Sequence, residues 1–324
     1  MENVLFVPST RDTAWVDEVL PGTSPAELPV AGRRIIDYSL ECARRRGILF
    51  AEILDWCFSE RLADDFSELT RTGYPVFYMK GEGDRPRGLA GIEGLSTPLT
   101  QMLPDGLVVV WGLCLNATDR FDALDPDTAA VTALTDAQVV KTPPGVYRRD
   151  GGRWVRLNLD CAAVDGVPAW HALNFAVLRQ PSRFTLPGYS AEKDVHLGRN
   201  VVLEKGARVT APALVQDNVW CARNVQLAGD VIIGANSFIA EGAVLRRTVV
   251  CDNTFIGLGL ELEGKIVVGS RIITARRACG PTWTIPASPV PPPTRRMRGF
   301  SGASPASCSA GPSGGSSDGT IHGT

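Results

Sequence analysis

The sequence predicts two regions of different class: an α/β domain in the N-terminal half, followed by an all-β left-handed parallel β-helix. Strand-like and helix-like segments alternate between residues 4 and 111, and ten six-residue repeats follow one another from residue 195 to residue 254. Alternating strands and helices are typical of a mostly parallel sheet with covered faces. A short fixed period is typical of a solenoid whose turns stack on one another.

The composition narrows the classes of function. The chain has 324 residues, is 44% hydrophobic and carries 33 Lys and Arg against 35 Asp and Glu, a net charge of −2. Such a small net charge gives no electrostatic reason to bind nucleic acid or an acidic membrane. No run approaches the roughly 18 apolar residues of a membrane span, and the start of the chain lacks the pattern of a secretory signal. We therefore expect a cytoplasmic protein with neither partner.

The first strand and helix are marked by a short apolar run and an amphipathic segment. Residues 4–8 (VLFVP) form an apolar run that predicts a buried strand. Residues 33–46 predict a helix that ends at Gly47 after a basic last turn. Its apolar face consists of Ile36, Leu40 and Ala43.

Three more strands and a second helix complete the predicted α/β region. Ser59 is placed to cap a helix that ends at Gly73, with an apolar face of Leu62, Phe66 and Leu69. The strand candidates are residues 48–54, 75–79 and 107–111. Ligands of such sheets bind at the carboxyl ends of the strands.

The middle of the chain gives weaker signals. Between residues 116 and 194 we identify one helix, at residues 168–180 (PAWHALNFAVLRQ), which leads into the repeats. The predicted organisation is an α/β domain at 1–121, a connecting segment with one helix at 122–193, a β-helix at 194–274 and a disordered tail at 275–324. The tail holds eight Pro, eight Gly and eight Ser among fifty residues, too little apolar surface to offset the entropy of ordering.

The six-residue repeats carry an apolar residue at every third position. These are Leu197, Leu203, Val209, Val215, Cys221, Leu227, Ile233, Ile239, Leu245 and Cys251. Most sixth positions hold Asn, Asp or Gly, which tolerate tight turns. Three extended sides close a triangular coil, so stacked coils pair their backbones and enclose one apolar column. After Asp252 the phase breaks, since Gly257 and Glu263 fall where aliphatic residues are due.

The loop after the first strand is the first place to look for a ligand site. It runs from Ser9 to Gly22 and holds no glycine between Pro8 and Pro21. A phosphate cradle uses glycines so that backbone N–H groups can approach the anion. Arg11 is the only cation of the loop.

Three segments together resemble the nucleotide-sugar pyrophosphorylases, the sugar-1-phosphate nucleotidyltransferases. They are VLFVP at the first strand, LPVAGRRIIDYSLE at 28–41, and GLSTPL at 94–99, which is similar to the family's G-T-A-x-x-L base-binding turn; a hexapeptide β-helix follows. The resemblance implies a Rossmann-like N-terminal fold, here abbreviated. It also implies transfer of a nucleotidyl group from a nucleoside triphosphate to a sugar 1-phosphate, with Mg²⁺ and basic residues neutralising charge.

The family's catalytic motifs are altered in this chain. Its glycine-rich loop is replaced by STRDTAW, its Lys position falls on Pro25 and its metal-binding Asp position falls on Leu113. The resemblance and the loop leave Arg11 and Asp12 as catalytic candidates and Asp119 as the metal candidate. Arg11, Gly94 and Ser96 are the candidates for binding the nucleotide.

Three functions stay open on the sequence. The first is a working nucleotidyltransferase that uses Mg²⁺ and binds a nucleotide and a sugar phosphate. The second is a non-catalytic binding or assembly subunit, which forms a homo-oligomer through the β-helix or a hetero-oligomer with an active relative. The third is a coenzyme A-dependent acyltransferase of the hexapeptide type, which needs a histidine base, and the available histidines are His171, His196 and His322.

Overall fold

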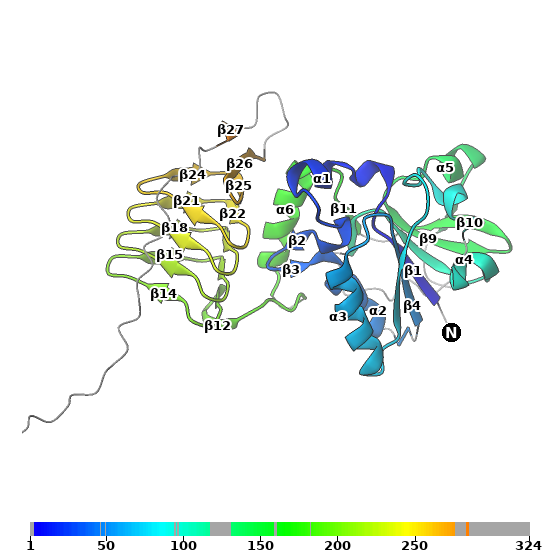
Figure 1. Cartoon of the computed structure of the whole chain (residues 1–324), viewed down its shortest axis with the longest axis horizontal. Helices are drawn as coiled ribbons and strands as arrows, with labels where there is room; N and C mark the ends of the chain where they lie inside the picture. The colour runs from blue at the N-terminus through cyan, green and yellow to red at the C-terminus, as the bar shows by residue number, and fades with distance from the viewer. Residues whose placement is uncertain are drawn as a thin grey trace, which may run out of the picture. The chain divides into compact units, whose positions relative to one another are not determined.

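A computed structural model describes residues 3–45, 47–48, 50–93, 95, 97–116, 131–158, 161–181, 183–275 and 283–284. A seven-stranded sheet forms the N-terminal region, with the order β5-β4-β1-β6-β9-β10-β8. Four strands in its first half run parallel, and they are β1 (Asn3–Val7), β4 (Phe50–Asp55), β5 (Val76–Lys80) and β6 (Val108–Trp111). Each lies within two residues of a predicted strand. Their carboxyl ends therefore meet at one edge of the sheet (Figure 1).

The second half of this sheet is antiparallel and was not predicted. It consists of β9 (Gly145–Asp150), β10 (Arg153–Leu157) and β8 (Val131–Ala133), with α5 (Asp136–Val140) beside them. β9 pairs with β6, and β10 returns beside β9 through Gly151 and Gly152, both at positive φ. Between residues 116 and 194 the sequence analysis identified only the helix at 168–180, and the structure adds these three strands. The charged residues of β9 and β10 hide the alternation, but the Gly-Gly pair is a hairpin signal.

Short helices connect the strands. α3 (Glu60–Arg71) begins as predicted at Ser59, whose hydroxyl accepts a hydrogen bond from the Leu62 N–H. α2 (Ile35–Arg45) begins two residues later than expected, because Arg33 and Arg34 pair with Pro29 and Val30 in a small hairpin. The remaining short elements are η1 (Arg11–Thr13), α1 (Trp15–Val19), η2 (Pro25–Glu27), β2 (Pro29–Val30), β3 (Arg33–Arg34), η3 (Leu89–Ile92), α4 (Pro98–Met102), β7 (Cys114–Asn116) and β11 (Cys161–Ala163).

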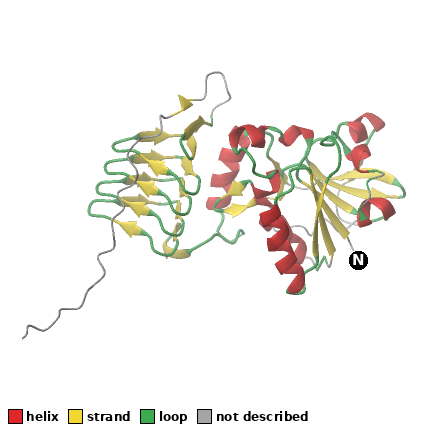
Figure 2. Ribbon diagram, viewed as in Figure 1, coloured by secondary structure: helices red, strands yellow, loops and turns green. Residues whose placement is uncertain are grey.

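The C-terminal region consists of short strands that add in turn to three sheets (Figure 2). Val195 pairs with Ala213 and Ala213 with Val231, so parallel partners lie 18 residues apart, three times six. This arrangement is compatible with a β-helix. The first sheet contains β12 (Tyr189–Glu192), β13 (Val195–Leu197), β16 (Ala213–Val215), β19 (Val231–Ile233), β22 (Thr248–Val250), β25 (Lys265–Val268), β26 (Arg271–Thr274) and β27 (Trp283–Thr284).

The other two sheets have four strands each. The second sheet contains β14 (Val202–Leu203), β17 (Trp220–Cys221), β20 (Phe238–Ile239) and β23 (Phe255–Ile256). The third contains β15 (Arg208–Thr210), β18 (Gln226–Ala228), β21 (Val244–Arg246) and β24 (Glu261–Glu263). Third-position residues from all three sheets, among them Val215, Cys221 and Leu227, form one apolar cluster.

The predicted spacing of six residues holds up to residue 245 but not for the last of the ten repeats. Val231 pairs with Thr248 and Ile233 with Val250, a spacing of 17 residues, so Val250 occupies the position that we assigned to Cys251. Arg247, at φ 45°, makes the turn in the shortened repeat. From there the pattern continues, since Ile256, Leu262 and Val267 all join the inner cluster. Gly257 and Glu263 therefore do not break the apolar column.

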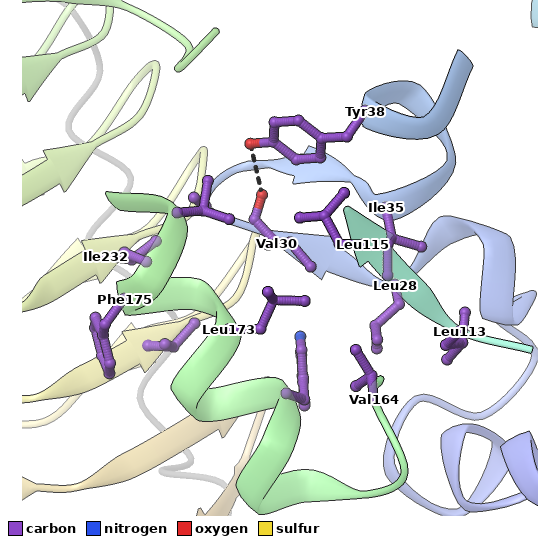
Figure 3. Packing of buried hydrophobic residues seen from close by; sticks show 14 of the residues in the cluster. Leu28, Val30, Ile35, Tyr38, Leu113, Leu115, Val164, Leu173, Phe175 and Ile232 are labelled. Carbon is purple, nitrogen blue, oxygen red and sulfur yellow. Dashed lines mark hydrogen bonds between the residues drawn. The ribbon is translucent and has the colours of Figure 1, made fainter. Parts of the chain in front are cut away.

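An apolar cluster joins the N-terminal region to the first sheet of the C-terminal region (Figure 3). Leu214, Ile232, Val249 and Ile266 point outward from that sheet and are at most 3% exposed. They pack in one cluster with α6 (Val167–Leu178), the predicted helix, and with residues of β2 and α2. The Tyr38 hydroxyl donates to the Val30 carbonyl inside this cluster.

No helix in the described parts of the chain has the length and apolarity that crossing a bilayer would require. The predicted disordered tail lies outside the described residues, apart from Ala275 and the two residues of β27.

Candidate functional site at the carboxyl edge of the N-terminal sheet

The candidate site lies where β1, β4, β5 and β6 end. The chain leaves β1 through Pro8 and forms the loop that should hold a ligand in a fold of this class. Loop residues 9–14 run through the 3₁₀ turn η1 into α1. The geometry of this loop decides what the edge can bind.

Asp55, the last residue of β4, ties the loop to the sheet. Its side chain is fully buried. The hydroxyls of Ser9 and Ser24 each donate to it, one to either oxygen. The Cys57 N–H donates to Oδ1 at 2.8 Å, and the Tyr78 hydroxyl donates to Oδ2 at 2.9 Å. Four donors therefore occupy both oxygens of this carboxylate.

Tyr78 connects this carboxylate to the next helix. Besides donating to Asp55, its hydroxyl accepts from the N–H of Ser59, the residue that caps α3. Burial raises the pKa of Tyr78 well above its ordinary value, and the nearby Asp55 carboxylate adds to the shift. Tyr78 thus stays a neutral donor at any physiological pH.

A cation that the sequence analysis did not single out lies beside this network. Arg85 forms an ion pair with Asp17 of α1, and its guanidinium lies 2.6 Å from the Cys57 sulfur. Burial raises the pKa of the Cys57 thiol, and the positive charge of Arg85 opposes that shift without cancelling it. Arg85 therefore links α1 to the turn that follows β4.

The backbone of the loop is also engaged within the chain. The Thr10 N–H donates to the Pro8 carbonyl and to the Thr13 hydroxyl, and the Arg11 N–H donates to the Pro86 carbonyl. Thr13 and Ala14 donate to carbonyls of the turn itself. A phosphate cradle needs N–H groups that point to the ligand, and these four point elsewhere.

The sequence-predicted residues fall in different places. Arg11 and Asp12 are both exposed on η1. Gly94, Ser96 and Asp119 lie outside the described residues, so the structure neither brings them to Arg11 nor separates them from it. Leu113, at the family's metal position, is 1% exposed and belongs to an apolar cluster.

The described residues of this edge do not fit a magnesium ion. Mg²⁺ takes oxygen ligands in near-octahedral geometry, whereas Leu113 offers a hydrocarbon side chain and both Asp55 oxygens are engaged. Among the residues that the structure describes, no group of three or more His, Cys, Asp or Glu side chains is placed to hold a metal.

A second buried carboxylate supports the segment after the predicted base-binding turn. Glu52 of β4 is fully buried, and one of its oxygens accepts from the Leu99 N–H of α4 at 3.2 Å. Burial raises the pKa of Glu52, and the hydrogen bonds from Thr97 and Leu99 reduce the shift. Glu52 thereby positions α4 directly after the Gly94–Ser96 segment.

The two described histidines proposed for acyl transfer lie on different elements, His171 on α6 and His196 on β13. The His171 ring Nε2 lies 2.8 Å from the Arg247 carbonyl, and burial lowers the pKa of this histidine. His196 is half-buried on β13, and His322 lies outside the described residues. An open cavity of about 460 Å³ adjoins His171 and Arg247, but Arg247 is paired there with Glu263.

Sequence reasoning missed the residues that close the edge. Ser9, Ser24, Asp55, Tyr78 and Arg85 come from five separate segments. One signal was available, because Asp55 directly follows the apolar run of β4, where a carboxylate needs partners.

Comparison with known proteins shows a similarity to part of a nucleotidyltransferase. A UTP–glucose-1-phosphate uridylyltransferase from Synechocystis sp. is 24% identical to this chain over 117 residues. This supports a nucleotidyltransferase-like relationship. The aligned stretch covers 36% of this chain and 30% of the uridylyltransferase, so the two proteins share only part of their lengths. No protein-family model matches the chain.

Proposed function

We propose that this chain is a nucleotidyltransferase-like protein of the nucleotide-sugar pyrophosphorylase type that acts as a binding or assembly subunit. In this proposal it has an abbreviated Rossmann-like domain and a left-handed β-helix of hexapeptide repeats, and it does not transfer a nucleotidyl group itself. The aligned uridylyltransferase supports the relationship, and the geometry of the first loop supports the loss of chemistry.

The closed first loop is the observation that carries the proposal. Binding a triphosphate there would require the N–H groups of Thr10 and Arg11 to leave their partners. It would also pull Ser9 away from Asp55, a carboxylate that is fully buried. Leaving a buried polar group unpaired costs about 1–3 kcal/mol each. The folded loop therefore opposes the contacts that nucleotidyl transfer needs.

The missing carboxylate at Leu113 adds to this argument. In-line attack at the α-phosphorus depends on neutralising charge that develops on the phosphates. The exposed Arg11 alone can attract a nucleotide or a sugar phosphate weakly, which suits a binding role better than a catalytic one.

A pyrophosphate-release assay tests this proposal. The full-length chain is supplied with Mg²⁺, a panel of nucleoside triphosphates and a panel of hexose 1-phosphates, with an active uridylyltransferase as the positive control. We expect no release above the protein-free background. Calorimetry with UTP and Mg²⁺ is expected to show binding weaker than micromolar.

The opposite result would favour a working enzyme. Release of pyrophosphate that is lost in Arg11→Ala or Asp12→Asn would show that these exposed residues act on substrate. Micromolar UTP binding that strengthens with Mg²⁺ would likewise overturn the non-catalytic assignment.

A further inference from the structure

The three sheets of the C-terminal region differ in the side chains on their outward faces. The first sheet presents aliphatic residues that the chain itself buries, among them Leu214 and Ile232. The third presents mostly polar residues at the equivalent positions, which are Arg208, Gln226, Val244 and Glu261. The second presents Val202, Trp220, Phe238 and Phe255, which we call the aromatic face.

The aromatic face is an ordered ladder. Its four residues pair in register along parallel strands, one directly above the next. The Trp220 and Phe238 ring centroids are 6.5 Å apart with 21° between their planes. The Phe238 and Phe255 centroids are 5.5 Å apart with 12° between their planes. The three rings stack along the ladder.

Part of this face is exposed although it is apolar. Phe255 is 48% exposed and Val202 is 38% exposed, and the neighbouring Leu258 is 75% exposed. At the same outward position on the first sheet, Leu214, Ile232, Val249 and Ile266 are at most 3% exposed. Contiguous exposed apolar patches mark interaction sites, and aromatic side chains dominate the centres of interfaces.

We propose that the aromatic face binds the aromatic face of a second copy of this chain. The two-fold axis runs along the strand direction, midway between β17 and β20. Trp220 of each copy then lies against Phe238 of the other, and Val202 lies against Phe255. This inference names the partner for the assembly role proposed above and rests on that role.

The charges that border the aromatic face favour this orientation. Arg223 and Glu241 lie in the turns where the chain leaves the aromatic face, three residues after Trp220 and Phe238 respectively. These two turns belong to successive coils, and both side chains are exposed. The proposed axis sets Arg223 of each copy opposite Glu241 of the other. In the turns that lead into the aromatic face, three residues before Val202 and Phe255, the axis sets Arg199 of one copy opposite Asp252 of the other. Both meetings join opposite charges, as complementary interfaces do.

The other simple two-fold arrangement is less favourable. An axis along the stack of coils would set each coil against its own equivalent. In the first coil, Arg199 of each copy would then meet Lys205 of the other, which are like charges, and in the second coil Asp217 would meet Arg223, which are opposite charges, so the favourable contacts only offset the unfavourable ones. The antiparallel arrangement avoids this repulsion.

The expected dimer is weak. Four strands about 4.8 Å apart span roughly 14 Å, and the aromatic face with its bordering turns is smaller than a standard interface of about 800 Å² per partner. Dimerisation should therefore depend on concentration, and charge changes at the border should shift it measurably.

Sedimentation velocity of the full-length chain over a concentration series tests the proposal. We expect Arg223→Glu alone and Glu241→Arg alone each to weaken dimerisation by about tenfold or more, because each creates two like-charge contacts. The double variant R223E/E241R should restore it. An equimolar mixture of the two single variants should form a mixed dimer, since each then meets the opposite charge on the other.

An apolar substitution gives a second test. Phe238→Ser should abolish dimerisation, whereas Val244→Ser, at the equivalent position of the polar third sheet, should leave it unchanged. A chain that stays monomeric at every concentration overturns the proposal, as does a dimer indifferent to the charge reversals. Neither result depends on nucleotide, so failure here is distinct from failure of the proposed function, which would show as pyrophosphate release.

Discussion

The buried Asp55 side chain determines the conformation of the candidate site. Burying a carboxylate is costly unless its oxygens are hydrogen-bonded. Here three hydroxyls and one backbone N–H supply those bonds, from four segments of the N-terminal region. The network holds the first loop close to β4, so the stability of the region and the closure of the loop depend on the same residue.

Replacing Asp55 by Asn should therefore destabilise the fold with little change of volume. Asparagine has an amide nitrogen in place of one carboxylate oxygen, and this nitrogen cannot accept hydrogen bonds from the groups that donate to that oxygen in the unaltered chain. We therefore expect a loss of about 2 kcal/mol in the free energy of unfolding. Urea denaturation followed by circular dichroism measures the loss. Asp64→Asn, on an exposed position of α3, is the matched control and should change stability by less than about 0.5 kcal/mol. Equal effects in both variants would refute the structural role of Asp55.

Individual residues of the site were the least predictable part. Arg11 and Asp12 could be identified because they stand next to a predicted strand end. Asp55 and Arg85 could not be connected, because the partners of a buried side chain depend on which strands become neighbours. Strand order is set by long-range packing that a single sequence does not display.

At the scale of elements, the turn at Gly32 links the two regions. Gly32 lies between β2 and β3 at φ 79°, in the LPVAG segment of the family resemblance. Its carbonyl accepts from the Gln216 side chain at 2.8 Å, and the Gln216 side-chain oxygen accepts from the Ala235 N–H. Glycine is required both by the positive φ and by the close approach of Gln216.

Gly32→Ala should cost more than positive φ alone explains. A Cβ atom there would lie 1.9 Å from Gln216 Nε2, so the hydrogen bond must break or the turn must move. Gly47→Ala is the control, because Gly47 has φ 71° and no atom within 4 Å of the added carbon. Strain at positive φ costs about 1–2 kcal/mol, and we expect Gly32→Ala to exceed Gly47→Ala by about 1 kcal/mol or more. Chemical denaturation of both variants would show the difference, and equal losses would mean that the Gln216 contact contributes little.

Elements with a strong period were predicted well, and those without one were missed. The residue types at the third position of each repeat located the short strands up to residue 245. The shortened repeat at Arg247 was invisible because Thr248, Val249, Val250 and Cys251 are all compatible with a strand in either phase. Only the strand pairing decides between the two phases. β9 and β10 escaped because their charged residues hide any alternation.

At the scale of the whole described chain, one apolar cluster packs the two regions against each other. It combines Trp170 and Leu173 of α6 with Val30 of β2 and with the outward residues of the first sheet. Polar contacts accompany it, since Arg179 pairs with Asp230, and Arg271 donates to the carbonyls of Glu18 and Val19. Burying the outward face of this sheet thus stabilises the contact between the two regions.

Ile232→Ser should uncouple the two regions. Ile232 is 2% exposed at this cluster. Removing its aliphatic side chain and burying a hydroxyl should cost about 3 kcal/mol or more. The inner apolar column is untouched, because Ile233, and not Ile232, faces it.

Hydrogen exchange followed by mass spectrometry can measure this uncoupling region by region. In the unaltered chain, amides of β1 and β19 should open with similar free energies. In the Ile232→Ser variant, we expect α6 and the N-terminal sheet to exchange sooner while β18 and β21 keep their protection. The Val244→Ser variant, altered on the polar third sheet, should exchange like the unaltered chain. Uniform loss of protection in Ile232→Ser would show instead that the C-terminal strands cannot stand without the N-terminal region, because the column would then depend on the cluster for its own stability.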